Sequence, residues 1–121
     1  MNAQQTYQQN SVNTATPAEL TLMLYKGGVR FINAAKRALE EGNVQDSHKY
    51  NVKAQEIVSE LIITLNTEYA ISNNLLSMYD YMRIRLIEAN VKKDVVILDE
   101  IKGYFEEFAI TWAEAMKSVK K

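Results

Sequence analysis

The sequence predicts an all-α protein, an antiparallel up-and-down four-helix bundle with a flexible or loosely docked N-terminal segment. Four long stretches place apolar residues at alternating steps of three and four residues, which is the spacing of one helix face. Short connections separate these stretches, so successive helices should run antiparallel. With 121 residues, 47% of them hydrophobic and 24% charged, the chain is long enough for one compact core and too short for two.

Composition and charge exclude several classes of protein. The 14 basic and 15 acidic residues are interspersed, so the chain lacks the clustered positive charge that a nucleic-acid-binding protein needs. It has no cysteine, which removes disulfides, thiolate catalysis and cysteine metal sites. No run of about 18 apolar residues could span a membrane, and the polar start is unlike a signal peptide. We therefore expect a cytoplasmic protein that neither binds nucleic acid nor inserts into a membrane.

Residues 1–15 form a polar segment that precedes the expected bundle of residues 16–121. Its main large apolar side chains are Tyr7 and Val12, which are too few for the segment to fold alone. The segment is either a flexible tail or a strap that docks these two side chains on an apolar groove of the bundle. Residues 16–19, Thr-Pro-Ala-Glu, then start the first helix with an N-cap threonine, a proline at the first helical position and a reciprocal glutamate.

The first helix is expected over residues 17–41, with Gly42 and Asn43 ending it. Gly27 and Gly28 lie inside it, where each costs roughly 1 kcal/mol relative to alanine. We therefore expect another helix to approach closely at this pair, and no phosphate-binding loop, because no strand precedes the glycines and no third one follows. The predicted core face consists of Leu20, Leu24, Gly28, Phe31, Ala35 and Ala38, flanked by Tyr25, Val29 and Ile32.

The second helix is expected to start within residues 43–46 and to end near residue 70. Its predicted core stripe consists of Ala54, Val58, Leu61, Ile62, Leu65 and Tyr69. A thinner apolar line of Val52, Ile63 and Ala70 lies about 130° further round the helix. Isolated apolar residues are common on protein surfaces, so this line gains meaning only beside a similar one on the next helix.

The third helix, over residues 72–90, is the element around which the fold is expected to be organised. Its predicted core stripe consists of Leu75, Met78, Tyr79, Met82, Leu86 and Ala89. A second stripe, about 100° further round, contains Leu76 and Ile87 with the aliphatic stem of Arg83 between them, and Tyr81 points in another direction. A helix with apolar residues on more than one side is either central in its fold or offers a surface to a partner. In so short a chain, the second explanation has to be considered seriously.

The fourth helix is expected to be capped by Asp94 and to continue to about residue 118. Its core face has the most regular spacing in the chain: Leu98, Ile101, Phe105, Phe108, Trp112, Ala115 and Val119. We therefore predict that this helix is the firm wall of the fold. Truncating Trp112 or Phe108 to alanine should cost roughly 3 to 5 kcal/mol.

The sequence contains no evident catalytic constellation. Its one histidine, His48, lies beside a lysine, as a solvated surface residue does, and a di-iron bundle would need two histidines. A histidine phosphotransfer module stays open as a minor alternative, although Val52 is larger than the neighbours such a site favours. Adjacent carboxylates such as Asp99 and Glu100 point to different sides of a helix and suit solvated faces. The residues predict a bundle that binds another polypeptide, without a cofactor, a metal or enzymatic activity.

Two sequence blocks carry a more specific signal: Thr-Ala-x-Pro-x-Glu-Leu at residues 14–20 and Asn-Leu-x-x-x-Tyr-Asp-Tyr-Met at residues 74–82. Together with Tyr7, residues 23–27 and 57–61, Ala89-Asn90 and a late Trp112, they resemble the flagellin-specific export chaperones of the FliS family. The resemblance covers nearly the whole chain in the expected order. Lys26 and Asn66 depart from it, because the family usually has acidic residues at these positions.

The resemblance implies a four-helix chaperone that binds the C-terminal segment of flagellin, prevents its premature polymerisation and delivers it to the flagellar type III export machinery. It implies no ATPase activity, a flagellar export-gate protein as a further partner, a monomer or weak dimer, and an N-terminal segment that gives way to flagellin. The groove is expected on the second and third helices. The candidate partner-binding residues are Tyr7, Val52, Ile63, Asn66, Leu76, Tyr81, Arg83 and Ile87. The alternative is an unrelated helical adaptor for some other amphipathic segment.

Overall fold

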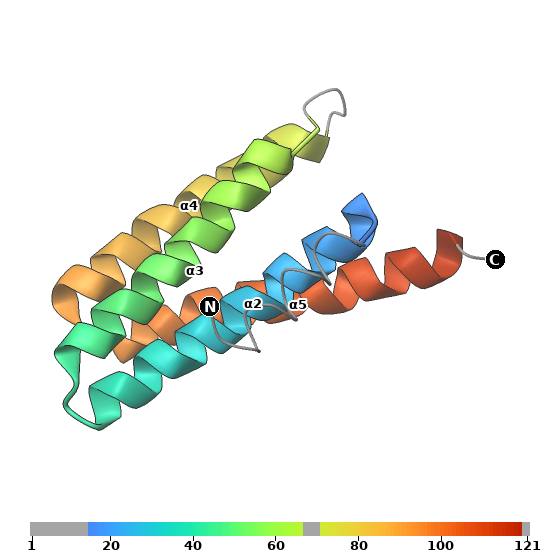
Figure 1. The fold of residues 1–121 in the computed structure, drawn as a ribbon. Coiled ribbons are helices and arrows are strands. Elements are labelled where there is room, and N and C mark those ends of the chain that lie inside the picture. The colour runs from blue at the N-terminus through green and yellow to red at the C-terminus, as the bar shows by residue number, and fades with distance from the viewer. Residues whose placement is uncertain (1–14, 67–70, 120–121) are drawn as a thin grey trace.

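The computed structural model describes residues 15–66 and 71–119, and Figure 1 shows it as a ribbon. These residues form four helices and no strand: α2 (Pro17–Glu40), α3 (Val44–Thr64), α4 (Ile71–Lys92) and α5 (Val95–Val119). The prediction of an all-α bundle is confirmed. The predictions for Tyr7 and the rest of the N-terminal segment, and those for Tyr69 and Ala70, fall outside the described residues.

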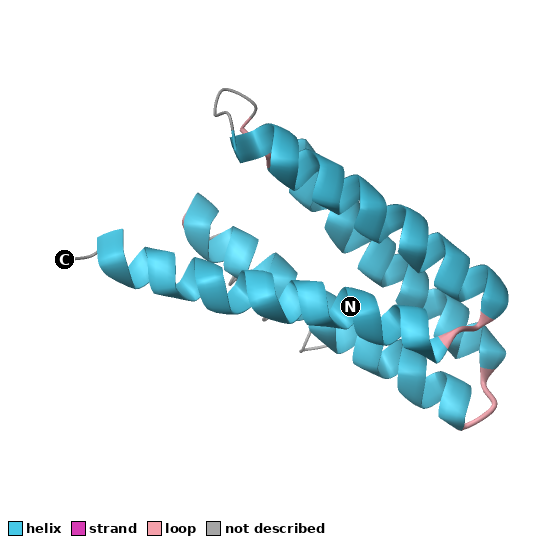
Figure 2. Cartoon of the chain, turned by 180° about the vertical axis from the view of Figure 1, so that it is seen from behind, coloured by secondary structure: helices cyan, strands magenta, loops and turns pink. Residues whose placement is uncertain are grey.

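The four helices form two pairs that diverge along the bundle. α2 packs against α3 and α5, and α4 packs against the same two helices. The α2–α5 pair and the α3–α4 pair lie close together at the end that holds the connections of residues 41–43 and 93–94, and they separate toward the other end (Figure 1, Figure 2). We call these the closed end and the open end. The open end holds the start of α2 and the end of α5.

The boundaries of α2 follow the sequence signals. At its start, Thr16 Oγ1 accepts a hydrogen bond from the Glu19 amide at 3.1 Å, as a capping box requires. At its end, Gly42 has a φ of +74°, the left-handed conformation that glycine adopts without strain. Asn43 Oδ1 then accepts a hydrogen bond from the Asp46 amide at 3.0 Å and so caps α3.

The connection between α3 and α4 differs from its prediction. α3 ends at Thr64 rather than near residue 70, because the backbone is extended at Leu65, with a ψ of 126°. Leu65 nevertheless packs against the core, so the apolar pattern continues beyond the end of the helix. α4 begins at Ile71, inside the segment expected to form the connection. The predicted cap of α5 is present, since Asp94 Oδ1 accepts a hydrogen bond from the Val96 amide at 2.9 Å.

The core draws on all four helices. Its fully buried apolar residues are Ile32, Ala35, Ala54, Val58, Met82, Leu86, Ala89, Leu98, Ile101 and Phe105. On α2 the core face is wider than predicted: Tyr25 and Ile32, expected on a flank, are buried, whereas Leu24 and Phe31 are only partly buried. The reason is that α2 packs against two neighbours, α3 and α5, so that a single stripe does not cover its contacts.

The close helix approach expected at the glycine pair is confirmed. A Cβ atom added at Gly28 would lie 2.6 Å from the ring of Phe105 on α5. One added at Gly27 would lie 3.3 Å from Ile57 Cδ1 on α3. The two glycines therefore let α2 approach both of its neighbours at the middle of the bundle.

The predicted core face of α5 is only partly buried. Its first part packs as expected, with Ile101 and Phe105 fully buried. Nearer the open end, Phe108 and Trp112 are partly buried and Ala115 is exposed, while the side chain of Val119 falls outside the described part. The expectation of a firm wall along all of α5 is therefore wrong for its second part. The reason lies in the shape of the bundle, because the α3–α4 pair diverges from α5 there (Figure 1).

Candidate partner-binding site

Two polar contacts set the antiparallel register of α3 and α4. Near the closed end, Asn90 Nδ2 and His48 Nδ1 lie 2.8 Å apart. One turn further along, the buried side chain of Asn51 donates from Nδ2 to the Leu86 carbonyl oxygen at 3.1 Å. Residues that follow His48 on α3 therefore lie level with residues that precede Asn90 on α4.

This register places Val52 level with Ile87, and Ile63 level with Leu76, on the two sides of the α3–α4 seam. Ile63 is 75% exposed and Ile87 is 42% exposed, whereas Val52 and Leu76 are half-buried. Arg83 lies between Leu76 and Ile87 along α4, and its Nη2 lies 3.6 Å from the Asp80 carboxylate. We call these five residues, Val52, Ile63, Leu76, Arg83 and Ile87, the seam surface. Exposed or half-buried apolar side chains of the two predicted stripes thus lie at the same levels along α3 and α4.

Asn66 lies just beyond α3, toward the open end of the same seam. Its carbonyl oxygen accepts a hydrogen bond from the hydroxyl of Ser72, a buried residue in the first turn of α4. This bond ties the start of α4 to the end of α3. The remaining candidate, Tyr7, falls outside the described residues.

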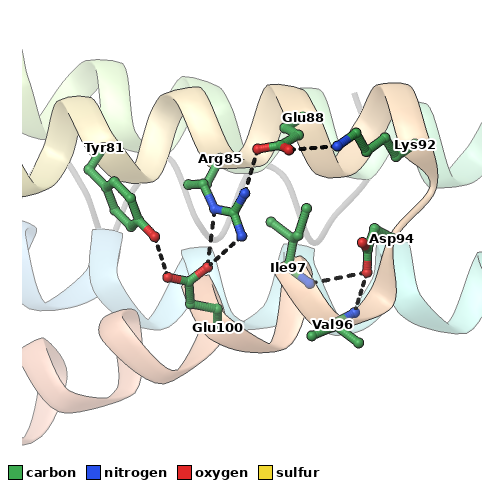
Figure 3. A network of polar contacts seen from close by, with 8 residues as sticks. All are labelled: Tyr81, Arg85, Glu88, Lys92, Asp94, Val96, Ile97 and Glu100. Atoms are coloured by element: carbon green, nitrogen blue, oxygen red, sulfur yellow. Dashed lines mark hydrogen bonds and ion pairs between the residues drawn. The ribbon is translucent and has the colours of Figure 1, made fainter.

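Tyr81 does not join the seam surface, because it faces α5 (Figure 3). Its hydroxyl donates a hydrogen bond to the Glu100 carboxylate, and its ring packs edge-on against Tyr104 with the centroids 6.2 Å apart. The hydrogen bond to Glu100 raises the pKa of Tyr81. The side chain is still 40% exposed, so it lies on the α4–α5 side of the molecule as a partly accessible residue.

Arg85 is the centre of a polar network on α4 and α5 that sequence reasoning missed (Figure 3). Its Nε and Nη2 atoms each donate to Glu100 Oε1 at 3.2 Å, and its Nη1 donates to Glu88. Glu88 also accepts a hydrogen bond from Lys92 at 2.8 Å. The hydrogen bonds from Lys92 and Arg85 lower the pKa of the Glu88 carboxyl. The spacings of three and four residues that bring Arg85, Glu88 and Lys92 together within α4 can be read from the sequence. The contact of Arg85 with Glu100 depends on how α4 and α5 pack.

The neighbouring carboxylate, Asp99, lies on a different side of α5 from Glu100 and pairs with Lys36 of α2. The prediction that this adjacent pair points to different sides of the helix is confirmed. The prediction that both residues are simply solvated is wrong, because each one links α5 to a different helix.

An aromatic cluster occupies the core toward the open end. The hydroxyl oxygens of Tyr25 on α2 and Tyr79 on α4 lie 2.6 Å apart in a buried hydrogen bond. Phe108 packs against both rings, and Trp112 packs edge-on against Tyr25. Trp112 Nε1 also donates to the Ala18 carbonyl oxygen at 2.9 Å, which holds the start of α2 against α5. Burial raises the pKa of both tyrosines.

A second apolar feature, also not predicted, lies between α2 and α5. It is a shallow depression of about 270 Å³ lined by Lys26, Val29, Glu106, Ala109 and Ile110. Its walls are mainly aliphatic, with one charged residue on each helix. The sequence marked Val29 only as a flank of α2 and did not mark Ile110, because it lies outside the core spacing of α5.

The described residues offer no evident catalytic chemistry. None of them forms a group of three or more histidine, cysteine or acidic side chains that could hold a metal ion. Among the described helices, none is both long and apolar enough to cross a membrane. The imidazole of His48 is bonded to Asn90 rather than set among acidic or nucleophilic groups. The fold and its accessible apolar seam define a class of helical bundle that binds other polypeptides.

Comparison with known proteins gives the family. The family described as "Flagellar protein FliS" matches residues 1–119. The chain is 47% identical to the flagellar secretion chaperone FliS of Bacillus subtilis over 115 residues, which cover 95% of this chain and 86% of the relative. It is 31% identical to the flagellar secretion chaperone FliS of Salmonella typhimurium, covering 88% of this chain and 81% of that one. This chain therefore belongs to the FliS family of flagellar secretion chaperones.

A solved structure has the same fold. It is described as the crystal structure of a flagellar chaperone from bacteria, and it matches with a TM-score of 0.79 over 96% of both chains. At 23% sequence identity, this match supports the fold alone.

Proposed function

We propose that this chaperone binds the C-terminal segment of flagellin, keeps it from polymerising before export, and delivers it to the flagellar type III export machinery. The seam surface is the site that we assign to the flagellin segment, with Asn66 at its open end. The observation that carries this assignment is the exposure of Ile63 and Ile87 on the two sides of one seam. An amphipathic segment laid along the seam would remove both isoleucines from water.

Further parts of the proposal concern residues outside the described ranges and the cellular setting. Residues 1–15 act as a strap that covers part of the binding surface through Tyr7 and yields to flagellin. The protein works in the cytoplasm as a monomer or weak dimer, meets an export-gate protein during delivery, and acts by binding rather than by catalysis. Tyr81 contributes from the α4–α5 side, where its exposed part could contact a segment that wraps around the bundle.

The test of the seam surface is a double substitution, Ile63→Gln with Ile87→Gln. Both side chains are exposed and glutamine is a good helix former, so the helicity and stability of the free protein should stay nearly unchanged. Each buried aliphatic contact contributes about 1.5 to 3 kcal/mol, so affinity for the C-terminal segment of the host flagellin should fall by about tenfold or more. Calorimetry would measure the affinity, and far-UV circular dichroism the fold.

A matched control is Val44→Gln, which changes an exposed aliphatic residue at the closed end, away from the seam surface. This variant should bind the flagellin segment like the unaltered protein. Unchanged affinity in the double variant would remove the seam surface from the interface. Loss of the fold in the double variant would show that the seam residues belong to the core.

A further inference from the structure

Gly103 lies inside the first half of α5, at a position where the described chain leaves open space for a side chain. A Cβ atom added at Gly103 would meet no other atom within 4 Å, in contrast to Gly27 and Gly28, which the neighbouring helices require to be small. Glycine is the poorest helix former after proline, so an exposed glycine inside a helix weakens that helix. Such a residue is explained when another backbone must approach it closely.

The surface around Gly103 carries exposed apolar residues at a regular spacing. Val96 precedes Gly103 by seven residues and Ile110 follows it by seven, so the three lie on one stripe of α5. Val96 is 77% exposed and Ile110 is 63% exposed. Figure 2 shows α5, the helix that leads to the C label, on the near side of the molecule with no other helix in front of it. We call Val96, Gly103 and Ile110 the α5 stripe.

Acidic residues flank Gly103 on both adjacent turns. Asp99 and Glu100 precede it by four and three residues, and Glu106 and Glu107 follow it by three and four. Asp99 forms an ion pair with Lys36, and Glu100 forms one with Arg85. Glu106 and Glu107 are exposed and make no hydrogen bond or ion pair with the described residues. On this part of α5 only Lys102, which is half-buried, carries positive charge.

The depression between α2 and α5 lies directly beside the α5 stripe, since Ile110 and Glu106 line it. Val29 and Ala109 supply the rest of its apolar wall. A helix lying along the α5 stripe would therefore find a hollow for one of its own aliphatic side chains. Lys26, on the α2 side of the depression, is basic, so the acidic surface of α5 does not continue onto α2 at this point.

From these features we propose that the α5 stripe is a second docking surface, separate from the seam surface, for an amphipathic helix of a partner protein with lysine or arginine along its flanks. The partner helix crosses α5 at Gly103, where the absent side chain lets the two backbones approach. Its apolar face covers Val96 and Ile110, and its basic flanks meet Glu106 and Glu107. This inference goes beyond the proposed binding of flagellin and does not depend on it.

The test uses a synthetic helical peptide that has leucine and alanine along one stripe and lysine on both flanks, with a scrambled peptide of the same composition as its comparison. Binding to the full chain would be measured by fluorescence anisotropy. We expect saturable binding of the amphipathic peptide that weakens by about tenfold or more in Gly103→Leu and in Glu106→Lys with Glu107→Lys. The control Asn33→Leu places the same new side chain on an exposed position of α2 and should not change the affinity.

Thermal unfolding of the variants separates binding from folding. Gly103→Ala and Gly103→Leu should keep or raise the thermal midpoint, because space is open and both residues form helices better than glycine. Gly28→Ala should lower it, because the new methyl group would meet the Phe105 ring. A fall of the midpoint in Gly103→Ala would show that Gly103 serves the fold and would overturn the proposal.

Four other results would also overturn it. Gly103→Leu could bind the amphipathic peptide as tightly as the unaltered chain, or the scrambled peptide could bind equally well, which would leave only non-specific attraction of charge. The C-terminal flagellin segment could displace the peptide, which would assign the stripe to flagellin. Sedimentation could show self-association that Gly103→Leu abolishes, which would assign the stripe to a second copy of the chain.

Discussion

The two ends of the bundle are built differently. Toward the closed end, Leu86 and Leu98 are fully buried, and the core is mainly aliphatic, with Ser47 and Asn51 as its buried polar residues. Toward the open end, the core contains an aromatic cluster with a hydrogen-bonded pair of tyrosine hydroxyls, and Leu65 and Leu75 are only partly buried, although Leu61 is buried. The helix pairs meet at the first end and separate at the second (Figure 1).

This difference indicates how one small domain can be both stable and adaptable. Burial of aliphatic side chains at the closed end contributes to the driving force for folding, since these side chains are fully removed from water. The partly buried residues of the open end cost less to rearrange, because their contacts with one another are less complete. We therefore expect stability to depend mainly on the closed end, and any adjustment to a partner to take place at the open end.

The largest expected effect comes from the same substitution made at each end. Leu98→Ala removes a fully buried side chain and should cost about 3 to 5 kcal/mol, the sum of lost transfer energy and a cavity. Leu75→Ala removes a partly buried one and should cost about 1 to 2 kcal/mol, because less surface is returned to water. Chemical denaturation of both variants would measure the difference. Equal losses would mean that the two ends contribute equally to stability.

A smaller effect is expected at the tyrosine pair. Tyr79→Phe leaves the Tyr25 hydroxyl buried without its partner, which should cost about 1 to 3 kcal/mol. Replacing both tyrosines by phenylalanine removes the unpaired group as well, so the double variant should be more stable than either single variant. Denaturation of the three variants forms a double-mutant cycle. If the two single losses simply add, the hydrogen bond does not couple the residues.

The sequence predicted the core better at the closed end than at the open end. Regular spacing identified Ile101 and Phe105, because a fully buried helix face repeats without interruption. Spacing also marked Ala115, which is exposed, because periodicity cannot tell where a neighbouring helix diverges. The end of α3 was misplaced for a related reason: Leu65 packs on the core after the helix has ended.

The candidate sites were predicted to different extents. The exposure of Ile63 and Ile87 could be predicted, because periodicity within one helix shows which apolar residues lie outside its core face; their role in binding stays a prediction. The contact of Tyr81 with Glu100 could not be predicted, because Glu100 lies on another helix. Gly103 carried no signal in the spacing of α5, since only the structure shows that the space around it is open.

The smallest expected effect concerns the acid stability of the α4–α5 network. Hydrogen bonds from Lys92 and Arg85 hold the pKa of Glu88 below its ordinary value of 4.5. The folded protein therefore binds a proton at this site less readily than the unfolded chain does. By linkage, the stability that Glu88 contributes is complete above a pH of about 4.5 and is lost as the pH falls through the lowered pKa.

Glu88→Gln removes this titration, so the unaltered protein should be more stable than the variant near neutral pH, and the difference should shrink as the pH falls below about 4.5. Added salt should also shrink it, because the network is partly exposed. Glu107→Gln is the control, since Glu107 is exposed and makes no hydrogen bond or ion pair with the described residues. Urea denaturation at several pH values would measure both. A difference for Glu88→Gln that stays constant through the acid range would mean that the ion pairs of Glu88 do not contribute to folding. The packing of α4 against α5 would then depend on Glu100 and on apolar contacts instead.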